Sequence, residues 1–172
     1  MASTTKLIIM SDSHGDREVI AQIKRHYQDQ ADVFFHNGDS ELAPTDPVLQ
    51  DVLVVAGNCD RPGLFPNNMV ATIDGLVIAQ THGHLYGINF SWQKLDYWAQ
   101  QEGADICIYG HLHVPSVEKR GATLFINPGS VSQPRGAVQE KLYVLLTIEE
   151  SQILVDFYTL DHEPFAHYQF DR

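Results

Sequence analysis

Cysteine is scarce in this chain, because its 172 residues include only Cys59 and Cys107. Two cysteines are too few for a disulfide framework, so the fold must depend on a hydrophobic core. Basic residues are also few, with 11 Lys and Arg against 22 Asp and Glu, for a formal charge of −11. Extended nucleic-acid binding needs clustered cations and is therefore disfavoured. The negative charge still allows a small phosphorylated substrate if metal ions supply positive charge at the site.

Long hydrophobic runs are missing as well. The one early apolar run covers residues 7–10, which is far too short for the apolar region of a signal peptide. No segment approaches the roughly 20 apolar residues of a membrane-spanning helix. We therefore expect a cytoplasmic protein with no membrane partner. The length, with 44% hydrophobic residues, suits one domain with a substantial core, which we assign to residues 1–172.

Strands and helices alternate in the first part of the chain. Short apolar runs predict strands over residues 6–11, 31–36, 51–56 and 105–109. Apolar residues at helical spacing predict helices over residues 17–28 and 92–102, the second of them capped by Ser91. Asp74 and Gly75 are typical of a tight hairpin turn between two further strands.

The later part of the chain has only strand patterns. They cover residues 116–120, 123–127, 141–148 and 152–160. Alternating strands and helices followed by strands alone predict an α/β sandwich with two sheets.

Five predicted strands end in a short polar cluster, with the sequences DSH, NGD, GNCD, HGH and GHLH. In open α/β sheets, functional sites lie beyond the carboxyl ends of the strands. We therefore expect the clusters to converge, although they are spread over residues 12–113. The last cluster carries His111 and His113, and side chains two residues apart on an extended chain point the same way.

The side chains in these clusters are of types that bind metals. Seven of them are candidates: Asp12, His14, Asp39, Asn58, His82, His111 and His113. Mixed oxygen and nitrogen donors suit borderline divalent ions such as Mn, Fe or Zn better than Ca or Mg. Seven ligands are too many for one four-coordinate ion and suit two ions that share a carboxylate. Such ions lie about 3.5–4 Å apart and clamp phosphoryl oxygens.

The order of the motifs resembles one known family. The series Asp12-x-His14, Gly38-Asp39, Gly57-Asn58, His82 and Gly110-His111-x-His113 is similar to that of the calcineurin-like metallophosphoesterases. The small size and the motifs GNCD, THGH and NPGS resemble the small bacterial and archaeal phosphodiesterase branch, over residues 6–136. The resemblance implies a four-layer αββα sandwich of two mixed β-sheets flanked by helices.

The same resemblance implies the chemistry. The protein would be a metal-dependent hydrolase of small phosphoesters, phosphodiesters before phosphomonoesters, in which two divalent ions activate a hydroxide. One ion would be held by Asp12, His14, Asp39 and His113. The other would be held by Asp39, Asn58, His82 and His111, with Asp39 bridging. Manganese is our first choice for both ions, with nickel, iron or zinc as alternatives.

We assign Asn58, Cys59 and His84 to the catalytic group. Many phosphoprotein phosphatases have a histidine in place of Cys59, where it protonates the leaving group. A thiol can donate a proton, although two nearby cations should lower its pKa toward the thiolate. This departure predicts weak general-acid help and a preference for good leaving groups. His36 and His84 flank ligands and are expected to orient them or to face the substrate.

Two other functions stay open. A non-catalytic scaffold on the same fold is the main alternative, because the phosphoesterase-like subunit of the retromer coat resembles this family but lacks part of the ligand set. This chain keeps every ligand type, which favours the enzyme. The second is a redox-sensitive regulator that acts through Cys59.

Two late features complete the predictions. The NPGS motif, residues 127–130, is expected to be a structural turn. Late aromatic side chains could cover a sheet edge or form the contact of a homodimer. They are Phe157, Tyr158, Phe165, Tyr168 and Phe170.

Overall fold

Two β-sheets form the centre of the computed structural model, which describes residues 4–172. One sheet contains β1 (Thr5–Met10), β2 (Val33–His36), β3 (Val52–Val54), β9 (Leu142–Ile148), β10 (Gln152–Thr159) and β11 (Pro164–Asp171). The other contains β4 (Asn68–Ile73), β5 (Leu76–Thr81), β6 (Ile106–Ile108), β7 (Ser116–Arg120) and β8 (Thr123–Asn127). The strand orders are β11-β10-β9-β1-β2-β3 and β4-β5-β6-β8-β7.

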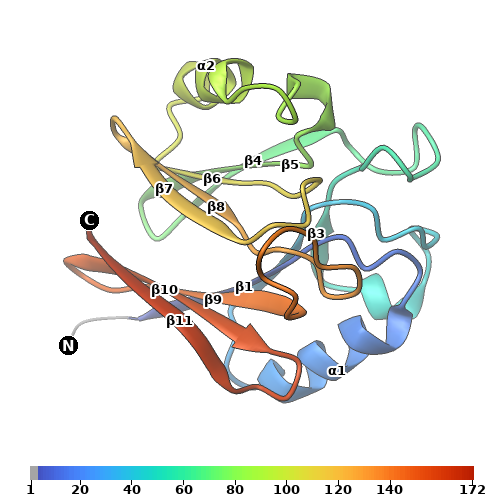
Figure 1. Ribbon diagram of the computed structural model, residues 1–172. Coiled ribbons are helices and arrows are strands. Elements are labelled where there is room, and N and C mark those ends of the chain that lie inside the picture. The colour runs from blue at the N-terminus through green and yellow to red at the C-terminus, as the bar shows by residue number, and fades with distance from the viewer. Residues whose placement is uncertain (1–3) are drawn as a thin grey trace.

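The two sheets pack face to face, with one α-helix on each outer face (Figure 1). The helices are α1 (Arg17–Tyr27) and α2 (Gln93–Gln101), and two short 3₁₀ helices are η1 (Pro47–Leu49) and η2 (His84–Tyr86). Both sheets are mixed, since parallel and antiparallel pairs occur in each. The predicted four-layer αββα sandwich is confirmed. Neither α-helix within residues 4–172 is long and apolar enough to cross a membrane.

The space between the sheets is filled by aliphatic side chains from both. The strands that supply them alternate inward and outward positions, so every second residue reaches this layer. The fully buried members include Leu7, Ile9, Ile78, Ile106, Leu124, Ile126, Val144 and Leu146. Burying one such side chain contributes roughly 1.5–3 kcal/mol, so this layer fixes how the two sheets lie relative to each other.

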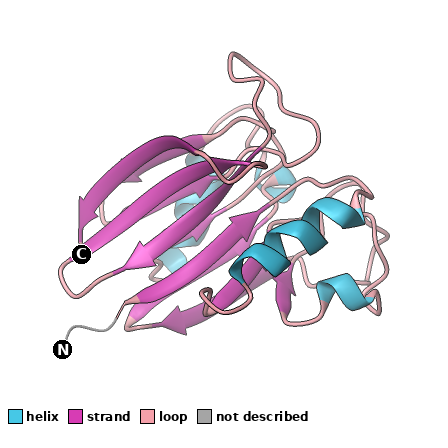
Figure 2. Ribbon diagram, turned by 90° about the horizontal axis from the view of Figure 1, so that it is seen from below, coloured by secondary structure: helices cyan, strands magenta, loops and turns pink. Residues whose placement is uncertain are grey.

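Helix α1 covers the outer face of the six-stranded sheet, as Figure 2 shows from below. Its N-cap is Asp16, whose side chain accepts a hydrogen bond from the Val19 N–H. Ile20 and Ile23 then point into the second core cluster, where Ile8 of β1 lies. The predicted helix over residues 17–28 is therefore confirmed to within one residue.

Helix α2 covers the outer face of the five-stranded sheet, with Leu95 and Ala99 buried. The predicted Ser91 cap is wrong by one position, because the N-cap is Trp92, which makes no side-chain capping bond. Ser91 Oγ still accepts a hydrogen bond from the Gln93 N–H. The helix ends where Gly103 adopts the left-handed conformation, with φ at +65°.

The carboxyl ends of the parallel strands meet at one edge of the sandwich. In the first sheet β1, β2 and β3 are parallel, and in the second β5, β6 and β8 are parallel. In Figure 1 the loops after β1, β2 and β3 lie on the side of the molecule opposite both termini. Gln80 of β5 links the sheets at this edge, because its amide donates to the main-chain carbonyls of His36 and Leu53.

Candidate metal centre

Five loops at this edge bring all seven predicted ligand side chains into one continuous cluster. His14 Nε2 lies 3.1 Å from His113 Nε2, which lies 3.1 Å from Asp12 Oδ1. Asp12 Oδ1 lies 3.7 Å from His82 Nε2. His82 in turn reaches the remaining ligands: Asp39 Oδ2 at 3.2 Å, Asn58 Oδ1 at 3.1 Å, and, through Asn58, His111. The predicted convergence of residues 12–113 therefore occurs.

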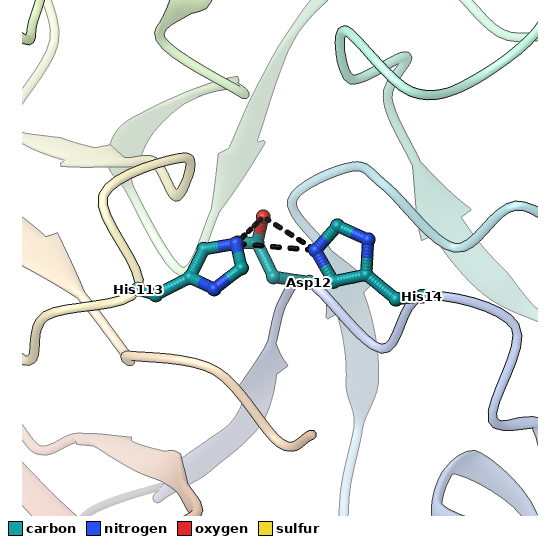
Figure 3. A group of neighbouring side chains, drawn as sticks. All are labelled: Asp12, His14 and His113. Atoms are coloured by element: carbon teal, nitrogen blue, oxygen red, sulfur yellow. Dashed lines mark hydrogen bonds and ion pairs between the residues drawn. The ribbon is translucent and has the colours of Figure 1, made fainter. Parts of the chain in front are cut away.

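Asp12, His14 and His113 form the first group of donors (Figure 3). Asp12 is fully buried, and its Oδ1 atom has no hydrogen-bond partner within residues 4–172. Leaving a buried carboxylate oxygen without a partner is costly. Ligand atoms about 2.1 Å from a common ion lie roughly 3.0–3.4 Å apart. Two of the three distances here are 3.1 Å, and the third, from His14 Nε2 to Asp12 Oδ1, is 3.9 Å. A cation at this position would satisfy the orphaned oxygen.

The two imidazoles of this group also fit a cation. His14 Nδ1 faces the Glu41 carboxylate at 3.0 Å, and His113 Nδ1 faces the Gln133 carbonyl oxygen at 2.6 Å. Because a carboxylate and a carbonyl can only accept, both Nδ1 atoms carry the proton. In the neutral rings, the two Nε2 lone pairs then face each other at 3.1 Å. Two lone pairs at that distance repel, and a cation bound to both turns the repulsion into attraction.

The second group of donors lies around His82. Its Nε2 is within 3.2 Å of Asp39 Oδ2 and Asn58 Oδ1. His111 Nδ1 lies 3.0 Å from the same Asn58 oxygen. An amide oxygen, a carboxylate and two imidazoles form a mixed donor set that suits a borderline divalent ion.

The backbone of the cluster is strained. Five of the seven candidate ligands have φ in the left-handed region: Asp12 at +56°, His14 at +47°, Asp39 at +59°, His111 at +70° and His113 at +58°. A left-handed conformation costs a residue with a side chain on the order of 1–2 kcal/mol. Such strain persists where the surrounding structure holds it, and it gathers at functional sites. The strain is thus independent support for a site here.

The charges of the cluster compensate each other in the metal-free chain. Burial alone would raise the pKa of Asp39, but the hydrogen bond and charge of His82, the Cys59 N–H bond and the charge of His14 together outweigh burial and hold that pKa at about 2. Burial alone would lower the pKa of His82, whereas Asp39 and Asp12 raise it. The raised pKa of His82 favours its protonated form, which would place a positive charge next to the Asp12 and Asp39 carboxylates, where a bound cation would lie.

Two glycines of the motifs allow the loops to approach closely. A Cβ on Gly57 would lie 2.6 Å from Asp39 Cγ, and a Cβ on Gly110 would lie 2.6 Å from Asp12 Oδ2. Neither distance is compatible with a side chain. The glycines in Gly57-Asn58 and Gly110-His111 are thus required because a ligand carboxylate of another loop packs against each of them.

The NPGS motif does more than form the expected turn. Ser130 Oγ donates to the main-chain carbonyl of Asp12 at 2.7 Å, and Ser132 Oγ donates to the same oxygen at 2.9 Å. Asn127 Nδ2 donates to the Gly110 carbonyl at 3.1 Å. The motif therefore holds two of the ligand loops in place.

Asp60 has a similar role that the sequence did not reveal. Its buried carboxylate accepts three main-chain N–H bonds, from Asp39 at 2.8 Å, Gly57 at 2.7 Å and Glu41 at 2.9 Å. The side chain thus joins the loop that carries Asp39 to the loop that carries Asn58.

Cys59, His84 and His36, the other predicted site residues, lie around the seven donors. Cys59 is exposed at the rim, and its Sγ can lie within 4.8 Å of donor atoms of His14 and Asp39. Burial and the charge of Asp39 raise the pKa of its thiol to about 11 in the metal-free chain. The His84 ring lies 5.3 Å from that of His82, and its buried Nδ1 atom has no partner among the described residues. The His36 ring bonds to Ser13 and Gly38 instead of to a ligand side chain.

A groove of about 360 Å³ begins at the rim beside Cys59. Its walls include Glu41, Leu42, Arg61 and Leu64. A larger cavity of about 500 Å³ lies between α2 and the β7–β8 turn and contains none of the candidate ligands. The groove at the rim contains none of the seven donors either, but Glu41, which contacts His14, and Cys59 line it, so it lies next to the cluster.

Comparison with known proteins agrees with this geometry. The model of the calcineurin-like phosphoesterase superfamily domain matches residues 5–151. A Bacillus subtilis protein named "Probable metallophosphoesterase YsnB" is 39% identical over 152 residues, which are 88% of this chain and 89% of that protein. The phosphodiesterase YfcE of Escherichia coli is 36% identical over 98 residues, 52% of this chain and 49% of YfcE.

Solved structures give the same result. The crystal structure of a Streptococcus pneumoniae protein described as a predicted phosphoesterase superimposes with a TM-score of 0.95 at 48% identity, over 99% of both chains. Vacuolar Protein Sorting 29 from Cryptosporidium parvum superimposes with a TM-score of 0.81 at 19% identity, over 98% of this chain and 99% of that chain. The second likeness shows the shared fold alone.

Proposed function

We propose that this chain, which belongs to the calcineurin-like phosphoesterase superfamily, is a metal-dependent hydrolase of small phosphoesters that prefers diesters to monoesters. The observation that carries the proposal is the buried Asp12 Oδ1, which lies among three imidazoles and has no hydrogen-bond partner in the described part of the chain. The phosphodiesterase YfcE, to which part of the chain is similar, supports the preference for diesters.

The seven donors would hold two divalent cations. We assign Asp12, His14, Asp39 and His113 to one cation and Asp39, Asn58, His82 and His111 to the other. Asp39 is assigned as the bridge because its carboxylate oxygens can lie near His14 on one side and near His82 on the other. Manganese is the first choice, with nickel, iron or zinc as alternatives. When bound, the cations would supply Lewis-acid charge to the phosphoryl oxygens and activate a water molecule.

The protein's own groups then have defined tasks. The ligand loops fix the position of the phosphoryl group, because Ser130 and Asp60 anchor them by hydrogen bonds. The His84 ring in η2 lies beside two ligand rings, with centroids 5.3 Å from that of His82 and 6.1 Å from that of His111, and is assigned to contact the substrate. The leaving oxygen must gain a proton as its bond to phosphorus breaks, and Cys59 is the thiol at the rim that could donate it.

A thiol at that position predicts which esters are good substrates. Weak proton donation favours leaving groups that need little protonation, such as a nitrophenolate. Replacing Cys59 by His should increase turnover most on esters with poor leaving groups, and replacing it by Ser should not. A dependence on leaving-group pKa that is the same in the wild type and both variants would exclude Cys59 as the donor.

The direct test of the function is hydrolysis of bis-p-nitrophenyl phosphate and p-nitrophenyl phosphate by metal-stripped protein. Added manganese, nickel, iron or zinc should restore turnover, faster on the diester. Asp39→Asn and His113→Ala should abolish that turnover. Binding of metal without any turnover would favour the alternative, a scaffold on the same fold, which the Vacuolar Protein Sorting 29 likeness illustrates.

A further inference from the structure

The candidate histidine ligands differ in what holds them. Two of them are fixed by main-chain carbonyl oxygens: His82 Nδ1 donates to Asn37 at 2.7 Å, and His113 Nδ1 donates to Gln133 at 2.6 Å. A main-chain acceptor orients the ring and directs Nε2 into the cluster, but it carries no formal charge. His111 is not held in this way, because its Nδ1 faces the cluster and lies 3.0 Å from Asn58 Oδ1.

Among the four candidate histidine ligands, and over residues 4–172, only His14 has a charged side chain at its Nδ1 atom. Its Nδ1 lies 3.0 Å from Glu41 Oε2, while its Nε2 faces the other donors. The His14 side chain is 11% exposed and that of Glu41 is 39% exposed, so the carboxylate forms the solvent-facing outer layer of the site. Of the three contacts that hold His82, His113 and His14 from behind, this is the one made by a side chain, so a substitution can remove it.

Glu41 is itself held in place for this contact. Its main-chain N–H donates to Asp60 Oδ1 at 2.9 Å, and its φ of +56° is in the left-handed region. The other oxygen of Asp60 accepts from the N–H groups of Asp39 and Gly57. The position of Glu41 is thus tied to the loop of the candidate bridging carboxylate.

A carboxylate behind a histidine changes the ligand in two ways. It fixes the proton on Nδ1, so that Nε2 always presents its lone pair, and it makes that lone pair more basic. Both effects strengthen a bond to a cation. His14 is assigned to one cation only, together with Asp12, Asp39 and His113, so the effect should be confined to that cation.

We propose that Glu41 is a positioning residue that orients His14 and strengthens binding of the cation between Asp12, His14 and His113. This inference depends on the proposed function, because it requires the cluster to bind metal. It predicts two cation sites of unequal sensitivity, one dependent on Glu41 and the other independent of it.

The test is a calorimetric titration of the metal-stripped full chain with Mn²⁺. The wild type should bind two ions. Glu41→Ala should weaken one of them by about 10–100-fold and leave the other unchanged. Glu41→Gln should show a smaller loss, because its amide oxygen can still accept from His14 without the charge. The control is Glu18→Ala, which removes an acid of α1 whose side chain is 72% exposed and pairs with Arg25 instead of with a candidate ligand.

Thermal unfolding of the metal-free variants separates positioning from folding. Both Glu41 variants should melt within about 2 °C of the wild type, as surface substitutions do. The inference would be overturned if Glu41→Ala bound both Mn²⁺ ions with the affinity of the wild type. It would also be overturned if the variant lost affinity equally at both sites and had a lowered melting temperature. A wild type that binds no Mn²⁺ would instead refute the proposed function.

Discussion

His36 should contribute to a loss of stability when the metal-free protein is acidified from pH 7 to pH 5. Its ring is fully buried behind the metal centre. Nδ1 accepts a hydrogen bond from the Gly38 N–H at 3.2 Å, which leaves Nε2–H to donate to Ser13 Oγ at 2.9 Å. A second proton would have to replace the Gly38 bond in a site without water access. Burial accordingly lowers the pKa of His36 to about 4.

The magnitude follows from proton linkage. An exposed histidine in the unfolded chain has a pKa of about 6.5. Between that value and about 4, the unfolded state binds more protons than the folded state, so the free energy of unfolding falls as the pH falls. The full pKa difference of about 2.5 corresponds to roughly 3 kcal/mol, of which about 2 kcal/mol is lost between pH 7 and pH 5. For a chain of this size that is a drop of about 4–8 °C in melting temperature.

The assay is urea unfolding from pH 7 to pH 5 in the presence of a chelator. The wild type and His36→Gln are compared, so that contributions of other titrating groups cancel. The variant should lose about 2 kcal/mol less over this range than the wild type. Equal pH dependence in both proteins would refute the argument that His36 is neutral in the fold.

Three further substitutions follow from the described contacts. Gly57→Ala forces a Cβ against Asp39, so Mn²⁺ affinity should fall more than tenfold and stability by about 1–3 kcal/mol; unchanged calorimetry would contradict the close approach. Tyr143→Phe removes a buried hydroxyl that bonds two side chains, and urea unfolding should show a loss of about 1–3 kcal/mol with hydrolysis intact. Ser130→Ala removes one hydroxyl donor to the Asp12 carbonyl, so turnover should decrease while the melting temperature falls by only a few degrees; full turnover would argue against a positioning role.

The convergence of the ligands could be predicted because each one directly follows an apolar run. Strands such as β1 and β6 are recognisable from a few buried residues, and parallel strands put their carboxyl ends at the same edge. The Asp74-Gly75 turn was predictable for a similar local reason. Both residues have positive φ, at +50° and +78°, as a two-residue hairpin turn requires.

The supporting residues could not be predicted because their partners are distant in sequence. Ser130 bonds to Asp12 across 118 positions, and Glu41 bonds to His14 across 27. Neither spacing has a local periodicity that marks the pair. The left-handed backbone of the ligands is equally hidden, since Asp and His adopt it only when the surrounding structure demands it.

The last strand was missed for a different physical reason. β11 begins at Pro164 and lies at the edge of the six-stranded sheet, where Phe165 and Tyr168 are partly exposed. Its pattern therefore lacks the continuous burial that marks strands such as β6 and β8. The strand does form a sheet edge, as one reading of the late aromatic residues suggested. The homodimer, the cytoplasmic location, the single domain over residues 1–172 and the redox role of Cys59 stay predictions.

Anomalous X-ray diffraction from crystals soaked in Mn²⁺ tests the metal centre most directly. We expect two peaks about 3.5–4 Å apart, one bounded by Asp12, His14 and His113 and the other by Asn58, His82 and His111, with Asp39 between them. A single peak, or peaks outside this cluster, would contradict the two-metal account.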